Sequence, residues 1–345
     1  MKNIKNKNYL MLFLVISIFI FITTIGWAAQ YNLKVGSVET AEGGNTLGWE
    51  VFKSYVEKTS NGKIQVELYP NNQLGDTSEL QEKLKIGILN ISQGDENITG
   101  MYDPMKLLQI PYLWDDEEMF LEFTNNSPFW DELNDGLERE TGLRMLAVNP
   151  YGIYCFINKT RPIKTIEDLH GLKLRTMLGS TQVIKALEGL GASATPVGWT
   201  EIYTSIKSGV LDGLPHTLTM IQDQKFYEVT KYLTLDYSFM GFNHTLVNAE
   251  WWNSLPKDIQ AIIEQGARMA SIAESGISMH RNYVTALDEI KDGGVEVYVL
   301  PQSEREKFKE AAQKPVIEWM NEVVGEEYVN KILEAAEEIR KNRGF

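Results

Sequence analysis

The chain contains a single cysteine, Cys155, so no disulfide can form within it. It also contains no glycine-rich phosphate loop, no Gly-x-Ser-x-Gly nucleophile elbow and no His-Glu-x-x-His zinc motif. Its four histidines are far apart and show no metal-ligand spacing. Cys155 lies within a predicted strand, with no helix start beside it to activate a thiolate, so we interpret it as a buried structural thiol. The sequence therefore offers no catalytic constellation and predicts no cofactor.

Basic residues are outnumbered, with 33 Lys and Arg against 47 Asp and Glu, giving a net charge of −14. The first 29 residues contain three lysines and no acid, so the rest of the chain is still more acidic. Nucleic acids require basic surfaces, and this balance excludes them as partners. It does not exclude an anionic ligand, because distant surface charges are screened and one buried arginine outweighs them.

Long apolar runs are scarce as well, and the one clear run is Leu10–Ile22. It follows the three lysines and precedes the small residues of Gly26–Ala29, the pattern of a secretory signal. We predict that residues 1–29 are a signal peptide and that the protein is exported to the periplasm or its extracytoplasmic equivalent. The run is short for a membrane span, although an uncleaved anchor stays an alternative.

Strand and helix patterns alternate along the rest of the chain, which predicts an α/β fold. Strands at 32–36, 64–69 and 88–92, with helices between them, form a βαβαβ unit. A strand at 143–149 is interrupted by Pro150–Gly152, a candidate crossover into a second lobe. A polar turn is expected at Pro215–Thr217. A long amphipathic helix opens at Pro256 and extends as far as Ile290.

The stretch Gly171–Trp199 contains a βαβ-like unit that brings two notable side chains to one sheet edge. Arg175 ends the strand Leu172–Arg175, and Trp199 follows the extended Ala194–Val197. Ligands bind at this edge of open α/β sheets. A guanidinium forms two parallel hydrogen bonds with a carboxylate, and an indole provides an apolar wall. On these residues alone, a structural ion pair and a core tryptophan are the more common outcome.

Five sequence motifs occur in an order that resembles a known family. They are GKIQVELYPNNQLGD at Gly62–Asp76, LKIGILNIS, RPIKTIEDLHGLKLR at Arg161–Arg175, GWTEIYTSIKSGVLDG at Gly198–Gly213 and QKFYEVTKYLTL at Gln224–Leu235. Over nearly all of the exported chain, this pattern resembles the solute-binding subunit of tripartite ATP-independent periplasmic (TRAP) transporters, the DctP-like type.

The resemblance implies a two-lobed, type II-like periplasmic binding protein fold, with crossing hinge strands and a long helix spanning both lobes. We expect residues 30–152 with 241–280 in the first lobe, and 153–240 with 281–345 in the second. It also implies that the protein is not an enzyme: it binds a small organic acid in the interlobe cleft and delivers it to an ion-gradient-driven membrane permease. We expect the binding protein itself to be a monomer.

By the same resemblance, Arg175 holds the ligand carboxylate, Trp199 stacks on the ligand and Asp95 meets it from the first lobe. Two positions depart from the family pattern. Tyr154 stands where many members have a second arginine, and His216 stands where most have an asparagine. Loss of one positive charge disfavours a compact dicarboxylate and favours a monocarboxylate with hydroxyl or aromatic parts.

Two further side chains are candidate ligand contacts: Glu39, which follows the first strand, and Met177, which follows Arg175 by two residues. The alternatives are a solvated loop acid for Glu39 and flexible apolar filler for Met177. Asp95 has the alternative of capping a helix, and Tyr154 and His216 of supporting the hinge. If His216 titrates near its ordinary pKa, ligand affinity changes between about pH 5.5 and 7.5.

Lobe closure is expected about crossings near Asn149–Ile153 and Phe239–Asn243. Two other functions are compatible with the sequence. One is a binding protein for an ATP-driven importer or a sensor, and the other is an exported enzyme on a two-lobed scaffold. The identity of the ligand does not follow from the sequence.

Overall fold

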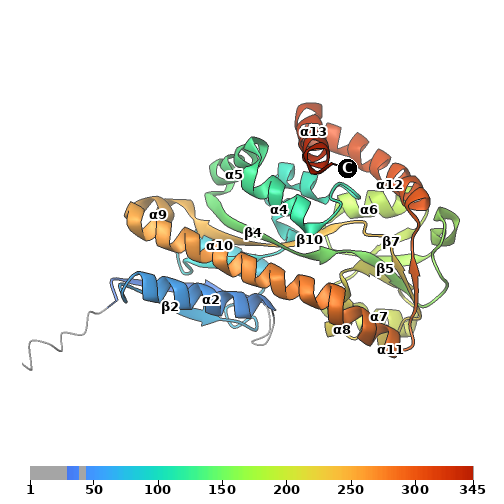
Figure 1. Ribbon diagram of the computed structural model, residues 1–345, viewed down its shortest axis with the longest axis horizontal. Coiled ribbons are helices and arrows are strands. Elements are labelled where there is room, and N and C mark those ends of the chain that lie inside the picture. The colour runs from blue at the N-terminus through green and yellow to red at the C-terminus, as the bar shows by residue number, and fades with distance from the viewer. Residues whose placement is uncertain (1–28, 39–43, 345) are drawn as a thin grey trace, which may run out of the picture.

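The computed structural model describes residues 29–38 and 44–344 (Figure 1). The predicted signal peptide, except for its last residue, and the candidate Glu39 lie outside these described residues. The chain forms two β-sheets with helices packed around them, and one long helical segment, which begins with α10, runs diagonally across both (Figure 1). This is the expected α/β architecture with two lobes.

The first sheet has the strand order β2-β1-β3-β10-β4. Its strands are β1 (Tyr31–Gly36), β2 (Ile64–Tyr69), β3 (Ile91–Gly94), β4 (Leu143–Ile153) and β10 (Met240–Asn248). Helix α2 (Gly44–Thr59) connects β1 to β2, and helix α3 (Thr77–Lys85) connects β2 to β3. The predicted βαβαβ unit is therefore present, but its third strand starts later than expected. The amides of Ile88 and Leu89 still bond to the carbonyl of Lys83 at the end of α3, which delays the strand.

The second sheet has the order β11-β9-β5-β8-β6-β7. Its strands are β5 (Cys155–Asn158), β6 (Lys173–Thr176), β7 (Ser193–Pro196), β8 (Gly213–His216), β9 (Tyr232–Leu235) and β11 (Glu296–Val299). The expected turn at Pro215–Thr217 is wrong, since Pro215 and His216 end β8. Pro215 is tolerated because the ladder between β6 and β8 is confined to the pair Leu174 and Gly213.

Two long strands, β4 and β10, lie antiparallel where the chain passes between the sheets. Tyr154 alone separates β4 from β5, and residues 236–239 separate β9 from β10. The predicted interruption at Pro150–Gly152 falls inside β4, opposite a register shift in β10. Gly241 of β10 has to be a glycine, because a Cβ there would lie 2.7–2.8 Å from the rings of Tyr151 and Tyr154.

One helical segment spans both lobes. It consists of α10 (Lys257–His280), a π-helical turn η6 (Arg281–Ala286) and α11 (Leu287–Asp292). Its first part packs on α2 and β4, and its end packs on α8 (Leu218–Asp223). Apolar residues repeat along its inner face from Ile259 to Ala270, and their burial fixes the helix to the first lobe.

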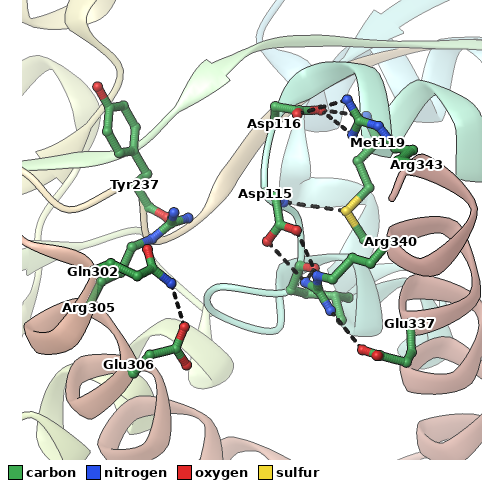
Figure 2. A network of polar contacts seen from close by, with 11 residues as sticks. Asp115, Asp116, Met119, Tyr237, Gln302, Arg305, Glu306, Glu337, Arg340 and Arg343 are labelled. Atoms are coloured by element: carbon green, nitrogen blue, oxygen red, sulfur yellow. Dashed lines mark hydrogen bonds and ion pairs between the residues drawn. The ribbon is translucent and has the colours of Figure 1, made fainter. Parts of the chain in front are cut away.

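The last two helices divide between the lobes. Helix α12 (Gln302–Val323) packs on α6 (Thr181–Gly189), whereas α13 (Glu326–Arg343) packs on α4 (Glu117–Asn126) and α5 (Pro128–Thr141). Arg340 and Arg343 of α13 reach Asp115 and Asp116 at the start of α4 (Figure 2). Although residues 281–345 were expected in the second lobe, α13 within that segment packs on helices of the first lobe. The lobe boundaries at 152, 240 and 280 stay a prediction.

A continuous apolar core joins the lobes beneath these terminal helices. It includes Phe120 and Leu133 from the first lobe, Leu187 from the second and Val316 from α12. The remaining elements are η1 (Glu96–Gly100), η2 (Asp103–Gln109), η3 (Ile166–Leu169), η4 (Trp199–Glu201), α7 (Ile202–Ser208), η5 (Phe226–Glu228) and α9 (Ala249–Ser254). Within residues 29–38 and 44–344, no helix is both long and apolar enough to cross a membrane.

Candidate functional site

The ends of the two sheets bring most of the predicted site residues together. Arg175 lies near the end of β6, His216 ends β8, Trp199 opens η4 and Tyr154 joins β4 to β5. Two residues from the first lobe complete the group, Tyr151 of β4 and Glu96 of η1. We call these six residues the arginine–aromatic cluster.

Arg175 is the cation of this cluster, and only 7% of its surface is exposed. Its Nε donates a hydrogen bond to the carbonyl of Val197 at 3.0 Å, and its guanidinium lies 5.5 Å from the ring centre of Trp199. In the described part of the chain, no carboxylate lies within ion-pair distance of it, and Nη1 and Nη2 make no hydrogen bond. A buried guanidinium held this way presents two donors to an external anion.

Aromatic rings pack next to Arg175. The rings of Tyr154 and His216 are stacked, with centres 4.6 Å apart and planes 21° apart. The Trp199 ring lies 5.1 Å from His216 on another side and is 37% exposed, which makes it the most open member of the group. A planar or apolar part of a ligand can pack on such a surface while its charged part reaches the arginine.

Glu96 provides an acid opposite these rings and is 2% exposed. One oxygen, Oε1, accepts hydrogen bonds from Tyr151 Oη at 2.8 Å, Tyr154 Oη at 3.2 Å and the amide of Phe242 at 2.9 Å. Burial, helped by the neighbouring charge of Asp95, raises the pKa of Glu96 to about 7. This carboxyl group therefore changes charge near neutral pH.

The expected titration of His216 near neutrality is wrong for this structure. Burial, and secondly the charge of Arg175, lower the pKa of His216 to about 3. Its Nδ1 accepts a hydrogen bond from the amide of Thr217 at 2.9 Å, which leaves Nε2 to carry the proton. His216 is thus a neutral donor at physiological pH, and Glu96 is the group that titrates in the predicted range.

Glu96 and Tyr151 were not predicted from the sequence. Glu96 lies two residues beyond the end of β3 at Gly94 and belongs to the short η1, so no strand or helix periodicity marks it. Tyr151 lies within the predicted crossover Pro150–Gly152, and this position was the available signal for it. Asp95 is half-buried and its charge acts on both Glu96 and Arg175. Its role, like that of half-buried Met177, stays a prediction.

A surface hollow of about 340 Å³ lies elsewhere, between α12, α13 and Leu113. None of the predicted site residues lines it, and its arginine, Arg340, is already bound to Asp115. We found no group of three or more metal-binding side chains in residues 29–38 and 44–344. The arrangement of the arginine–aromatic cluster suits reversible binding of an anion.

Two α/β sheets, paired crossing strands and a helix across both lobes are features of a two-lobed solute-binding protein. A family model described as bacterial extracellular solute-binding protein, family 7, matches residues 35–322, and the chain belongs to this family. The TRAP resemblance found in the sequence is thereby confirmed.

Individual proteins agree with this assignment. The C4-dicarboxylate-binding periplasmic protein DctP of Rhodobacter capsulatus is 29% identical over 83% of this chain and 85% of its own. The ectoine-binding periplasmic protein TeaA of Halomonas elongata is 29% identical over 81% of each chain. A TRAP periplasmic solute-binding protein from Ochrobactrum anthropi superimposes with a TM-score of 0.84 at 26% identity, over 91% of this chain and 97% of that one.

Proposed function

We propose that the protein captures a small organic acid between its lobes and delivers it to the ion-gradient-driven permease of a TRAP transporter. The observation that carries this proposal is Arg175, a buried guanidinium without a carboxylate partner among the described residues. The family consists of binding proteins, and its relatives named above bind C4-dicarboxylates or ectoine. Arg175 is the anchor for the ligand carboxylate in this proposal.

The surroundings of Arg175 favour a ligand with one carboxylate and a ring or hydroxyl-bearing body. Tyr154 supplies no second positive charge, and Glu96 adds an acid that opposes a second carboxylate. The exposed side of Trp199 and the neutral His216 offer a stacking surface and a hydrogen-bond donor. Asp95, Glu39 and Met177 complete the proposed ligand contacts.

The proposal includes the export of the chain and the cleavage of its signal peptide. Residues 1–29 direct export and are then removed, and the remaining protein acts as an extracytoplasmic monomer that leaves its ligand chemically unchanged. Intact-mass measurement of the exported protein tests the cleavage. A chain that keeps residues 1–29 would contradict that part of the proposal.

The ligand class is tested by thermal unfolding of the wild-type protein with a panel of carboxylates that includes succinate, D-glucuronate and ectoine. A ligand at a hundred times its Kd should stabilise the fold by about 2.7 kcal/mol. Mass spectrometry of the recovered ligand must show it unaltered. If no carboxylate in the panel raises the unfolding temperature, or if the ligand is converted, the proposed function fails.

Ligand binding should also bring the lobes together, because the cluster takes Glu96 and Tyr151 from one lobe and Arg175 and Trp199 from the other. The crossing strands and the continuous core under α12 and α13 restrict this motion to a hinge. Small-angle scattering with and without the stabilising carboxylate measures the closure. An unchanged radius of gyration at saturation would contradict the hinge.

A further inference from the structure

Asn282 lies in the π-helical turn of the long helix and is 5% exposed. Its side chain bonds to backbone groups outside its own helix. Nδ2 donates to the carbonyl of Tyr151 at 2.8 Å, and Oδ1 accepts from the amide of Thr219 at 3.0 Å. One amide group therefore links the crossing strand β4 to the first turn of α8.

Both backbone positions belong to segments that contain members of the arginine–aromatic cluster, Tyr151 and His216. Tyr151 donates its hydroxyl proton to Glu96 and stacks beside His216 at 6.4 Å between ring centres. Thr219 follows Thr217, whose amide bonds to the His216 ring at 2.9 Å. Asn282 thus lies behind two members of the cluster without belonging to it.

The packing around Asn282 leaves little freedom for these segments to shift. Gly152, next to Tyr151, has a φ of 137°, and a Cβ there would lie 2.5 Å from Asn282 Nδ2 and 3.0 Å from a methyl group of Thr217. Because Gly152 has no side chain, the amide group of Asn282 fits between β4 and the start of α8. A π-helical turn is a rare irregularity that recurs at functional sites, and here it contains this residue.

We propose that Asn282 is a positioning residue for ligand recognition: it holds Tyr151 and His216 at the separation that the bound ligand requires. The inference rests on the proposed function and deepens it. Asn282 does not contact the ligand itself, and its effect on affinity passes through its hydrogen bonds to the backbone of Tyr151 and Thr219. It also ties the long helix directly to the binding site.

The test compares Asn282→Asp with a matched change, Asn134→Asp. Asn134 of α5 donates to the carbonyl of Met145 at 2.9 Å and accepts from its amide at 3.1 Å, at the far end of the same strand β4. Each substitution replaces a donor NH₂ by an oxygen of similar size. Both variants should lose stability, but only Asn282→Asp should weaken binding, by about tenfold at pH 8.

Protonation supplies a rescue that a purely structural role would not give. At about pH 5 the carboxyl group introduced by Asn282→Asp can regain a proton and donate to the carbonyl of Tyr151, so the ratio of variant to wild-type Kd should fall toward one. Asn282→Ala, which lacks both bonds and any charge, should stay about tenfold weaker at both pH values. The probe is the panel carboxylate that stabilises wild-type protein most, with Kd measured by calorimetry.

The outcomes separate the two proposals. Wild-type affinity in both Asn282→Ala and Asn282→Asp, or an equal loss in Asn134→Asp, would overturn the positioning role and leave the proposed function intact. Weak binding by Asn282→Asp alone would assign the effect to the new charge and also overturn it. If no carboxylate stabilises wild-type protein, the proposed function fails and this inference fails with it.

Discussion

Arg175 and Arg340 are both largely shielded from solvent, but only Arg340 is neutralised by carboxylates of the described chain. Arg340 binds Asp115 through Nε at 2.7 Å and lies 3.7 Å from Glu337 (Figure 2). Its neighbour Arg343 binds Asp116 and Glu118. Arg175 has a carbonyl and an indole face instead.

This difference indicates that Arg340 has a structural role, whereas Arg175 can bind a ligand. A guanidinium with its charge already satisfied gains little from an incoming anion, even where it borders a surface hollow. A desolvated guanidinium without a counter-ion gains the full charge-assisted interaction when a carboxylate arrives. The presence of an arginine is therefore less informative about function than whether its donors are occupied.

Removing the unpaired cation should have the largest effect. Two charge-assisted hydrogen bonds correspond to roughly a hundredfold to ten-thousandfold in affinity, so Arg175→Ala should abolish measurable binding. Arg175→Lys keeps the charge but loses the two-pronged geometry and should still be severely weakened. Calorimetry with the stabilising carboxylate measures both. Unchanged affinity in either variant would remove Arg175 from the anchor role.

Glu96→Gln removes the titratable charge next to Arg175 and should change the pH dependence of stability. All three hydrogen bonds described above end on Oε1, so a glutamine oxygen can accept them unchanged. The pKa of Glu96 is raised to about 7, so its contribution to stability falls as pH rises from about 4.5 to about 7. Relative to wild type, the variant should gain about 2–3 kcal/mol of unfolding free energy between about pH 5 and pH 8.

Denaturant unfolding at a series of pH values measures this gain. The buried side chains of His216 and His244 have pKa values lowered to about 3. In both proteins their contribution to stability is therefore lost as pH falls below about 6.5, which is opposite to the effect of Glu96. Their contribution cancels in the difference between variant and wild type. A difference that does not vary with pH would show that Glu96 does not titrate in this range.

Trp199→Ala should weaken carboxylate binding by about tenfold, because it removes the exposed stacking surface and the contact with Arg175. Trp319 of α12 offers a matched control, because its ring also lies next to a cation, with Lys185 Nζ 6.0 Å from the ring centre, but is not part of the arginine–aromatic cluster. Fluorescence titration or calorimetry compares Trp199→Ala with Trp319→Ala. Equal losses in the two variants would assign the effect of Trp199 to general packing.

The smallest effect is expected at the paired cation. Arg340→Ala should lower the free energy of unfolding by about 1 kcal/mol, because the pair with Asp115 is partly exposed and screened. Ligand affinity should stay within about twofold of wild type. Chemical denaturation and calorimetry on the same preparation give both numbers. A large loss of affinity would mean that α13 contributes to the binding site.

Local patterns predicted much of this fold because periodicity and caps are encoded over short stretches. The strand Ile64–Tyr69 and the long helix after Pro256 follow that rule. Arg175 and Trp199 were also predictable, since a single βαβ-like unit brings both to one edge. Glu96 and Tyr151 were not, because 55 residues separate them and only the crossing of the lobes makes them neighbours.

The end of β8 shows a second reason for failure. A proline followed by polar residues is typical of a turn, yet Pro215 and His216 continue a strand because sheet contacts override local preference. The ionisation of His216 likewise depends on burial and on Arg175, neither of which the local sequence contains. Charge state and pairing in the site are properties of the tertiary structure.

The position of β10 has a consequence for the order in which the chain can fold. β10 lies between β3 and β4 in the first sheet, although almost the whole second lobe precedes it in the sequence. β4 therefore has no partner in its sheet until residues 240–248 are available. The first lobe cannot be completed as an early, independent unit during synthesis, and such long-range pairing slows folding. In the proposed export, the chain would cross a membrane before it folds, and slow folding of the first lobe would then be an advantage.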